Sequence, residues 1–337
     1  MKRRTYRSIY LCLAVILLTT IYMLHAMILS FDHPLDPAGQ DQFFEVLPGQ
    51  SFEMVARQLE KKDLISSSSV FLFMGYRLDT FDKIKAGEYL LSSKMTPRNI
   101  HEILTAGSVY RLLLTIPEGL TIDEMAELWE SKGFGTHQEL IESVRRFSVP
   151  DFQTPITGWE GYLFPDTYSL VRRTRPDELV AMMFSRFRTV LKPDWIAAAQ
   201  RNGFSTHEVV TLASLIEKET RVDSERPIVA SVFINRLKRG MLLQCDPTVI
   251  YANRGTFNGN IRRSDLDAVD PYNTYTTPGL PPGPIANPGE KALYAACFPA
   301  ETAYYYFVAD GTGGHVFNKS LEEHHGAVKE YRKSLRN

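Results

Sequence analysis

The first pattern along the chain is an uncharged, mostly apolar run from Ser8 to Phe31. As a helix, these 24 residues would extend about 36 Å, enough to cross a hydrocarbon core of ~30 Å. Four basic residues precede the run and Asp32 follows it. The positive-inside rule therefore predicts a cytoplasmic tail over residues 1–7, a transmembrane anchor over 8–31 and an exported remainder. A cleaved signal peptide is the alternative, but the run is long and no small-x-small site ends it.

Two later segments share one pattern of a strand, a proline-containing turn, a Ser or Thr cap and an amphipathic helix. In the first copy, residues 43–51 lead into a helix over 52–64. In the second, residues 112–121 lead into a helix over 122–134. Two copies are too few for a solenoid, so the pattern predicts a duplicated strand–helix unit.

The rest of the chain mixes helices with short strands. Strands are predicted at 87–91 and 110–116, and a hairpin of 304–309 with 315–317 is predicted around a glycine-rich turn. Cap signals predict helices that start near Thr96-Pro97, Thr136, Pro176, Trp195, Ser205, Glu225 and Ser320. This segregated arrangement predicts an α+β fold without regular βαβ alternation. We expect a linker over 32–42, a small subdomain over 43–110 and a larger mixed α+β domain over 111–337.

The helix that begins after Ser205 carries the chain's most informative chemistry. Val209, Leu212, Ala213 and Ile216 share one face of it, with Glu217 and Glu219 on the two flanks of that face. A carboxylate in an apolar wall costs free energy unless it is paired or protonated. Burial also raises its pKa, as a general acid at neutral pH requires.

A second interpretation of this helix stays open at the level of the sequence. Glu217 and Glu219 could be ordinary flank carboxylates that are held by arginines such as Arg221 or Arg226. If the apolar wall is the correct interpretation, Glu217→Gln should change stability little or even raise it, because an acid in such a wall is strained.

Charge and composition narrow the class of function. The four basic residues of the tail leave 34 basic against 39 acidic residues after it, a formal charge of −5. That balance argues against a nucleic-acid partner, which needs a basic surface. The eight histidines are scattered without a His-Glu-x-x-His motif, so we expect no metal. Cys245 and Cys297 would face an oxidising compartment and could either pair or stay free.

Several sequence blocks, in this order and spacing, resemble the MltG-type (YceG-like) family of endolytic murein transglycosylases. The resemblance runs from the apolar segment to near the C-terminus and is most specific over about residues 159–318. The blocks are Glu160-Gly-Tyr-Leu-Phe-Pro-Asp-Thr-Tyr168, Glu217-Lys-Glu-Thr220, Ser231-Val-Phe-Ile-Asn-Arg-Leu237, Leu243-Gln-Cys-Asp-Pro-Thr-Val-Ile-Tyr251, Tyr272-Asn-Thr-Tyr275, Gly279-Leu-Pro-Pro-Gly283, Tyr306-Phe-Val-Ala-Asp310 and Gly314-His-Val-Phe-Asn318. Cys245 departs from the pattern, because a Ser or Thr is expected there.

The resemblance implies a cofactor-independent lyase that cuts peptidoglycan glycan strands beside the cytoplasmic membrane. It singles out Glu217 as the group that protonates the glycosidic oxygen and then takes the proton of the substrate's C6 hydroxyl, which leaves a 1,6-anhydro end. It implies that the small subdomain is LysM-like, either a glycan binder or only a spacer. Peptidoglycan synthases are candidate partners. The candidate substrate-binding residues are Glu219, Gln244, Asp246, Thr248, Tyr251, Asn273 and Tyr275.

Two other functions stay open. A water-using muramidase needs two carboxylates, and Glu219 or Asp246 could be the second. A non-catalytic wall-binding scaffold needs no buried acid. An acyl-serine peptidase is excluded, because no Ser has a Lys three residues later.

Overall fold

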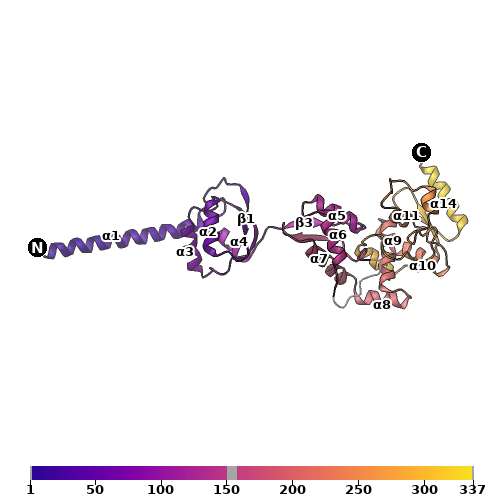
Figure 1. Cartoon of the computed structure of the whole chain (residues 1–337), viewed down its shortest axis with the longest axis horizontal. Helices are drawn as coiled ribbons and strands as arrows, with labels where there is room; N and C mark the ends of the chain where they lie inside the picture. Colours follow the sequence, from indigo (N-terminus) through magenta and orange to yellow (C-terminus); the bar gives the residue numbers. More distant parts are fainter. Residues whose placement is uncertain (1, 150–157, 336–337) are drawn as a thin grey trace. The chain divides into compact units, whose positions relative to one another are not determined.

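The computed structural model describes residues 2–149 and 158–335, and its elements are drawn in Figure 1. It is a mixture of helices and short antiparallel strands, which confirms the predicted α+β class. The chain divides into two compact units. Unit 1 contains the chain up to Leu112 together with Leu170–Arg172, and unit 2 contains the remainder. The sequence predicts a boundary near residue 110 but not the return of 170–172.

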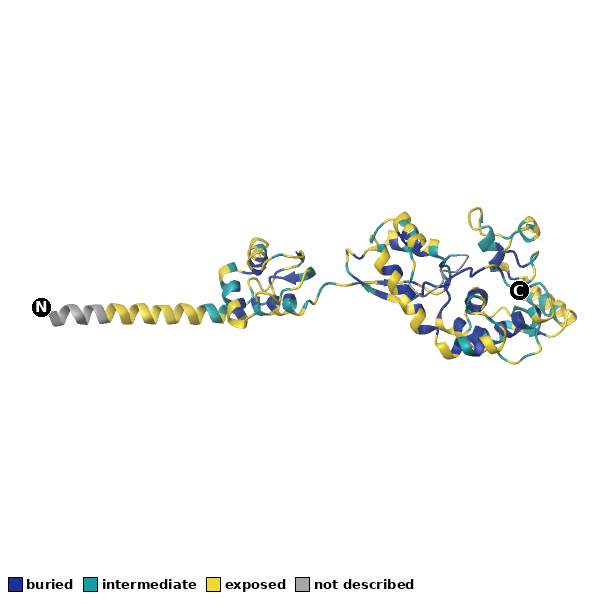
Figure 2. Cartoon of the chain, turned by 60° about the horizontal axis from the view of Figure 1, so that its bottom comes forward, coloured by how far each residue is buried: buried dark blue, intermediate teal, exposed yellow. Residues whose placement is uncertain are grey.

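The N-terminal helix α1 (Lys2–Leu29) continues into a short 3-10 turn, Ser30–Asp32. Over Leu11–Asp32 it is long and apolar enough to cross a membrane, by length and composition only. Its side chains from Leu11 to Leu24 are exposed (Figure 2). This helix is compatible with the predicted single-pass anchor.

Residues 32–42, expected to form a linker, are instead held against unit 1. Phe31 is 4% exposed in that unit's core, with its ring 6.3 Å from that of Phe73. Asp32 forms an ion pair with Arg98 at 2.6 Å. The Asp36 amide donates to the Ser93 carbonyl at 3.0 Å. The hydrophobic pattern did not reveal this docking, because Phe31 reads equally well as the end of the apolar run.

Unit 1 is built around an antiparallel pair of strands in which Asp41 faces Ser92 and Val46 faces Gly87. One of its helices, Ser68–Leu78, is absent from the sequence prediction, which placed a single helix over 52–64. Its elements are β1 (Asp41–Val46), α2 (Phe52–Lys61), α3 (Ser68–Leu78), β2 (Gly87–Ser92) and α4 (Pro97–Ala106). The core includes Phe44, Val55, Leu59, Phe71, Met74, Tyr89, Leu91, Ile100 and Leu104.

The second copy of the duplicated pattern leads into unit 2. Its capping box is formed by Thr121 and Glu124, and another by Thr136 and Glu139 begins the next helix, as predicted. The strand β4, which the sequence did not predict, pairs with β3. The elements here are β3 (Leu112–Thr115), α5 (Ile122–Ser131), α6 (His137–Arg146), β4 (Thr167–Leu170) and α7 (Pro176–Val190).

Helix α9 (Thr206–Glu219) lies at the centre of unit 2 and packs against α8, α10, α11 and α13, most of which surround it in Figure 1. The predicted Ser205–Glu208 capping box begins it. Every residue from Val209 to Ile216 is buried, so the helix is covered on all sides rather than on one face. The remaining elements are α8 (Pro193–Arg201), η2 (Asp223–Glu225), α10 (Arg226–Lys238), α11 (Asp246–Ala252), α12 (Arg263–Asp267), α13 (Glu290–Cys297), β5 (Tyr306–Ala309), β6 (His315–Asn318) and α14 (Leu321–Ser334).

Candidate functional site

Glu217 lies in the last turn of α9 with its side chain only 7% exposed. Its Oε1 is 3.0 Å from Nη1 of Arg226, whose side chain is 6% exposed. Its Oε2 accepts a hydrogen bond from the Gly289 amide at 2.9 Å. Both contacts hold the carboxylate oxygens in place. The apolar wall of the sequence prediction exists on α9, but the carboxylate itself is paired with Arg226, which the alternative interpretation allowed.

Two segments lie beside Glu217, one at Gly119 and the other at residues 287–289. Gly119, at a φ of +80°, donates to the carbonyl of Asn287 at 2.9 Å, and the Asn287 amide donates to the carbonyl of Leu120 at 2.9 Å. The side chain of Lys218 also contacts this region, because its Nζ donates to the Gly119 carbonyl at 3.1 Å. The side chains at the end of α9 and the backbones of these two segments are thus joined by hydrogen bonds.

The buried side chain of Asn287 connects three segments behind Glu217. Its Oδ1 accepts from the amides of Gly161 and Leu163 at 2.9 and 3.0 Å. Its Nδ2 donates to the carbonyl of Leu120 at 3.0 Å and to Oε1 of Glu160 at 2.7 Å. Burial raises the pKa of Glu160 to about 8, so this carboxyl is mostly neutral at pH 7. Glu160 therefore acts as part of the support beneath the segments at Gly119 and residues 287–289.

Glu219 lies in a different environment from Glu217. Burial raises its pKa to about 7, and the nearby charge of Asp246 acts in the same direction. The thiol of Cys245 hydrogen-bonds with it. Cys245 and Cys297 are both free thiols, so they do not pair. The residue that departs from the family pattern thus contacts a candidate site carboxyl.

His315 lines both the compartment that contains Glu217 and the compartment that contains Asp246. Its position is set by Glu225. The Glu225 carboxylate contacts Nδ1 of His315 at 2.7 Å and accepts from the His315 backbone amide at 2.8 Å. The hairpin β5–β6 that carries His315 was predicted from the sequence. Its attachment to Glu225 at the start of α10 was not.

These groups line a groove that has two neighbouring compartments with some lining residues in common. One, of about 850 Å³, contains Glu217 and Arg226. The other, of about 310 Å³, contains Asp246 and Tyr275. Both are lined by Glu219, Ala309 and His315. A groove with carboxylates along its length suits a long, polar, uncharged chain better than a compact apolar ligand.

The structure brings Gln244, Asp246 and Tyr275 together in the smaller compartment. The Tyr275 hydroxyl donates to Oδ1 of Asp246 at 2.5 Å. Asp246 is the first residue of α11, and Cys245 is the cap residue of that helix. Its exposed carboxylate is therefore directed to Tyr275 rather than to the helix.

Thr248 and Asn273 are buried and engaged with the backbone. The Thr248 hydroxyl donates to the Cys245 carbonyl at 2.6 Å. The side-chain Nδ2 of Asn273 donates to the backbone carbonyls of Asp265, Leu266 and Ala268 at 3.2, 3.1 and 2.7 Å. We infer that these two candidates shape the segments around the groove rather than contact a ligand.

Tyr251 lies outside the residues that line the two compartments. Its ring is 5.0 Å from that of Tyr272, and the Arg254 guanidinium lies over it at 4.5 Å. Burial raises its pKa, and its hydroxyl hydrogen-bonds with Glu160. Tyr251 therefore belongs to the buried support around Glu160 rather than to the groove.

Sequence reasoning missed Glu118 and Gly289, which lie close to the Glu217 carboxyl. Glu118, from the turn between β3 and α5, lines the larger compartment. Gly289 precedes α13, a helix that the sequence did not predict, because its cap position is a glycine without a side-chain cap bond. An acid directly before a capped helix was the only available signal for Glu118.

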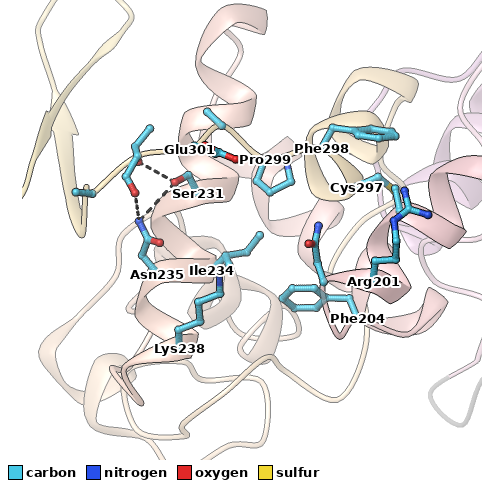
Figure 3. A pocket seen from close by; sticks show the side chains of 15 residues that line it. Arg201, Phe204, Ser231, Ile234, Asn235, Lys238, Cys297, Phe298, Pro299 and Glu301 are labelled. Atoms are coloured by element: carbon cyan, nitrogen blue, oxygen red, sulfur yellow. Dashed lines mark hydrogen bonds between the residues drawn. The ribbon is translucent and has the colours of Figure 1, made fainter.

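A separate cavity of about 790 Å³ lies between α8, α10 and the segment after α13. Figure 3 shows Arg201, Phe204, Lys238 and Phe298 around it. Asn235 crosses one wall and donates to the Thr302 carbonyl at 2.9 Å. It contains none of the candidate site residues.

Comparisons with known proteins agree with the earlier resemblance. A family model for the YceG-like family matches residues 44–330. An endolytic murein transglycosylase of Bacillus subtilis is 33% identical over 84% of this chain and 82% of its own length. One of Streptococcus pneumoniae is 29% identical over 87% of this chain, which spans 58% of that relative. The crystal structure of a YceG-like protein from Listeria monocytogenes matches with a TM-score of 0.57 at 30% identity, over 86% of this chain and 99% of that one. This chain therefore belongs to the YceG-like family.

Proposed function

We propose that this protein is an endolytic murein transglycosylase that cuts the MurNAc–GlcNAc bond of peptidoglycan strands. The observation that supports it most is a buried carboxylate, Glu217, oriented by Arg226 and the Gly289 amide at a groove. The names of the Bacillus and Streptococcus relatives give the same activity for those proteins.

In this proposal Glu217 acts twice. It protonates the glycosidic oxygen as the C1–O bond breaks, and it then takes the proton of the C6 hydroxyl as the C1–O6 bond forms. No water is consumed, and the product carries a 1,6-anhydro-MurNAc end. The rigid hold on Glu217 supplies the fixed geometry that both proton transfers require.

The test is the activity of purified Glu217→Gln on purified glycan strands. The amide keeps the shape of the side chain but cannot donate the proton, so the rate should fall at least ~10²-fold. Full activity in this variant would refute the site assignment and favour a site elsewhere. A scaffold without activity would show no cleavage in the wild type either.

A water-using muramidase is the second candidate, and Glu219 is the observation that favours it. A carboxyl with a pKa of about 7 beside Asp246 is a pair of the kind that hydrolases use. The two candidates differ in their product, because hydrolysis leaves a reducing end.

We also propose that α1 spans the cytoplasmic membrane with its N-terminus inside. The basic residues before the apolar run support this orientation. A reporter that works only in the cytoplasm, fused after Asn337, should be inactive. An active fusion would overturn the topology.

The enzyme is then expected to act on newly made glycan near the membrane. The docking of Phe31 and Asp32 onto unit 1 leaves no free linker between that unit and α1. Labelled nascent strands should be cut more often than old ones, and a long flexible insertion after Asp32 should weaken that preference. Equal cutting of both by the native protein would contradict the idea. Peptidoglycan synthases remain candidate partners, and glycan binding by a LysM-like unit 1 remains a prediction.

A further inference from the structure

Glu118 and Glu217 approach each other at Gly289, although they are far apart in the sequence. The Gly289 amide donates to Oε2 of Glu217 at 2.9 Å. A Cβ added to Gly289 would lie 1.9 Å from Oε1 and 2.6 Å from Oε2 of Glu118. Two carboxyl groups, both of which line the larger compartment, thus lie against the same glycine.

The position of Glu118 is fixed by its neighbour Gly119. Gly119 is held from two directions, by the carbonyl of Asn287 and by Nζ of Lys218. A Cβ on Gly119 would be 3.4 Å from Cγ of Glu217. The backbone at Gly119 therefore brings the exposed side chain of Glu118 to the side of Gly289 on which Glu217 lies.

The surrounding cations are divided unequally between the two carboxyls. Arg226 is 3.0 Å from Glu217, and its Nε is 3.3 Å from Asp223. Lys291 forms an ion pair with Asp223. Glu118 has no ion pair among the residues that the structure describes. The other charged or titratable groups that line this compartment are Lys218, Glu219, Arg221, His315 and Tyr331.

Both electrostatic effects on Glu118 favour its neutral form. Burial, and then the charge of Glu217, raise the pKa of Glu118, and Arg226 and Lys291 oppose them only in part. Two adjacent carboxyls that cannot both ionise hold one proton between them. The Arg226 guanidinium and the Gly289 amide both bind the Glu217 carboxylate, and Glu118 has neither interaction within the described part of the chain, so we place the shared proton on Glu118.

We propose that Glu118 stores the proton that Glu217 delivers to the glycosidic oxygen. This inference rests on the proposed function. The proton passes from the Glu118 carboxyl to the Glu217 carboxylate and then to the leaving oxygen as the C1–O bond breaks. The proton of the C6 hydroxyl returns to Glu217 and then to Glu118 as the C1–O6 bond forms. No proton is gained or lost over the cycle. Glu118 acts through Glu217 and is a positioning residue.

The test is the pH profile of kcat for Glu118→Gln, measured with the full chain on purified glycan strands. The amide is neutral, so it removes the repulsion that keeps a proton on the pair at high pH. The basic limb of the profile should move to lower pH by about one unit, as expected for the loss of one adjacent charge. An unmoved basic limb in a folded, active variant would overturn the proposal.

Glu290→Gln is the matched control, because it removes an exposed carboxylate next to Gly289 that lies outside the groove lining. Its basic limb should stay in place. An equal shift in this control would show a general charge effect and contradict the proposal.

A second measurement does not depend on the activity of Glu118→Gln. The carboxyl carbon of Glu118, followed by NMR, should titrate at lower pH in Glu217→Gln than in the wild type, because the repelling charge is absent. The same titration in both proteins would overturn the pairing. If Glu217→Gln is inactive while neither the basic limb nor this titration moves, the proton-storage inference fails and the proposed function stands. If Glu217→Gln is fully active, the proposed site itself fails.

Discussion

The surroundings of Glu217 and of Glu219 differ sharply, although these two groove carboxyls are only two residues apart in the sequence. Glu217 is paired with the buried guanidinium of Arg226 and bonded to a backbone amide. At Glu219, burial raises the pKa to about 7, and Cys245, His315 and Arg236 lower it only in part. The difference teaches that one helix can place a fixed, oriented carboxylate and a titrating carboxyl in one groove.

The largest expected effect separates the two carboxyls by activity. Glu217→Gln should lose at least ~10²-fold in rate, whereas Glu219→Gln should lose less than ~10-fold, because acid–base groups contribute ~10²–10⁴-fold. Rates on the same purified glycan strands give the comparison. A larger loss in Glu219→Gln than in Glu217→Gln would assign the acid role to Glu219 instead.

The next effect concerns stability at Glu217. Among the residues that the structure describes, Glu217→Gln leaves the buried charge of Arg226 with Asp223 as its partner, so it should lower the free energy of unfolding by up to about 3 kcal/mol. Denaturant unfolding of unit 2 measures this loss. The sequence alone predicted little change or a gain, which assumed an unpaired acid in an apolar wall. An unchanged free energy of unfolding would mean that the ion pair between Glu217 and Arg226 makes no net contribution to stability.

A third effect tests the close approach at Gly289. The backbone there has a φ of −79°, which any residue can adopt, but a Cβ would collide with the Glu118 carboxyl. Gly289→Ala should lower kcat by about 10-fold to 100-fold, as displacement by roughly 1 Å does at other sites.

Gly255→Ala is the control for that substitution, because its Cβ would meet nothing within 4 Å. It should keep wild-type activity. Wild-type activity in Gly289→Ala would show that the position of Glu118 is irrelevant to the reaction.

The smallest effect concerns pH and stability at Glu219. The folded-state pKa of about 7 lies above the ordinary value of 4.5 for a glutamate. The stability associated with neutral Glu219 is therefore full below about pH 4.5 and is lost as the pH rises through 7. Glu219→Gln cannot ionise, so its melting temperature should fall less than that of the wild type between pH 5 and pH 8. Parallel melting curves for the two proteins would contradict this environment for Glu219.

The elements that the sequence predicted best are those whose signals are local. The capping boxes at Ser205, Thr136 and Ser320 begin helices in the structure as expected. The β5–β6 hairpin also forms where its glycine-rich turn indicated. The helix before Asp79 and the helix after Gly289 were missed, because neither has the capping box or amphipathic spacing that marked the others.

The site was less predictable, because its defining contacts are long-range. The sequence offered Arg226 only as one of two possible partners for the glutamates, and the fold decided between them. Glu118 reaches Gly289 through a turn 171 residues earlier in the chain. Burial of Thr248 and Asn273 also depends on how their segments fold back on each other. Residue type suggested sugar contacts for both, but tertiary packing engages their polar atoms internally.

The central claim is that Glu217 directs an intramolecular attack, and the isotopic composition of the product ends tests it most directly. Glycan strands are cleaved in water enriched in ¹⁸O, and the new ends are weighed by mass spectrometry. The account predicts 1,6-anhydro ends that are one water lighter than hydrolysed ends and contain no ¹⁸O. Reducing ends that carry ¹⁸O would contradict it and identify the protein as a hydrolase with a second catalytic carboxylate.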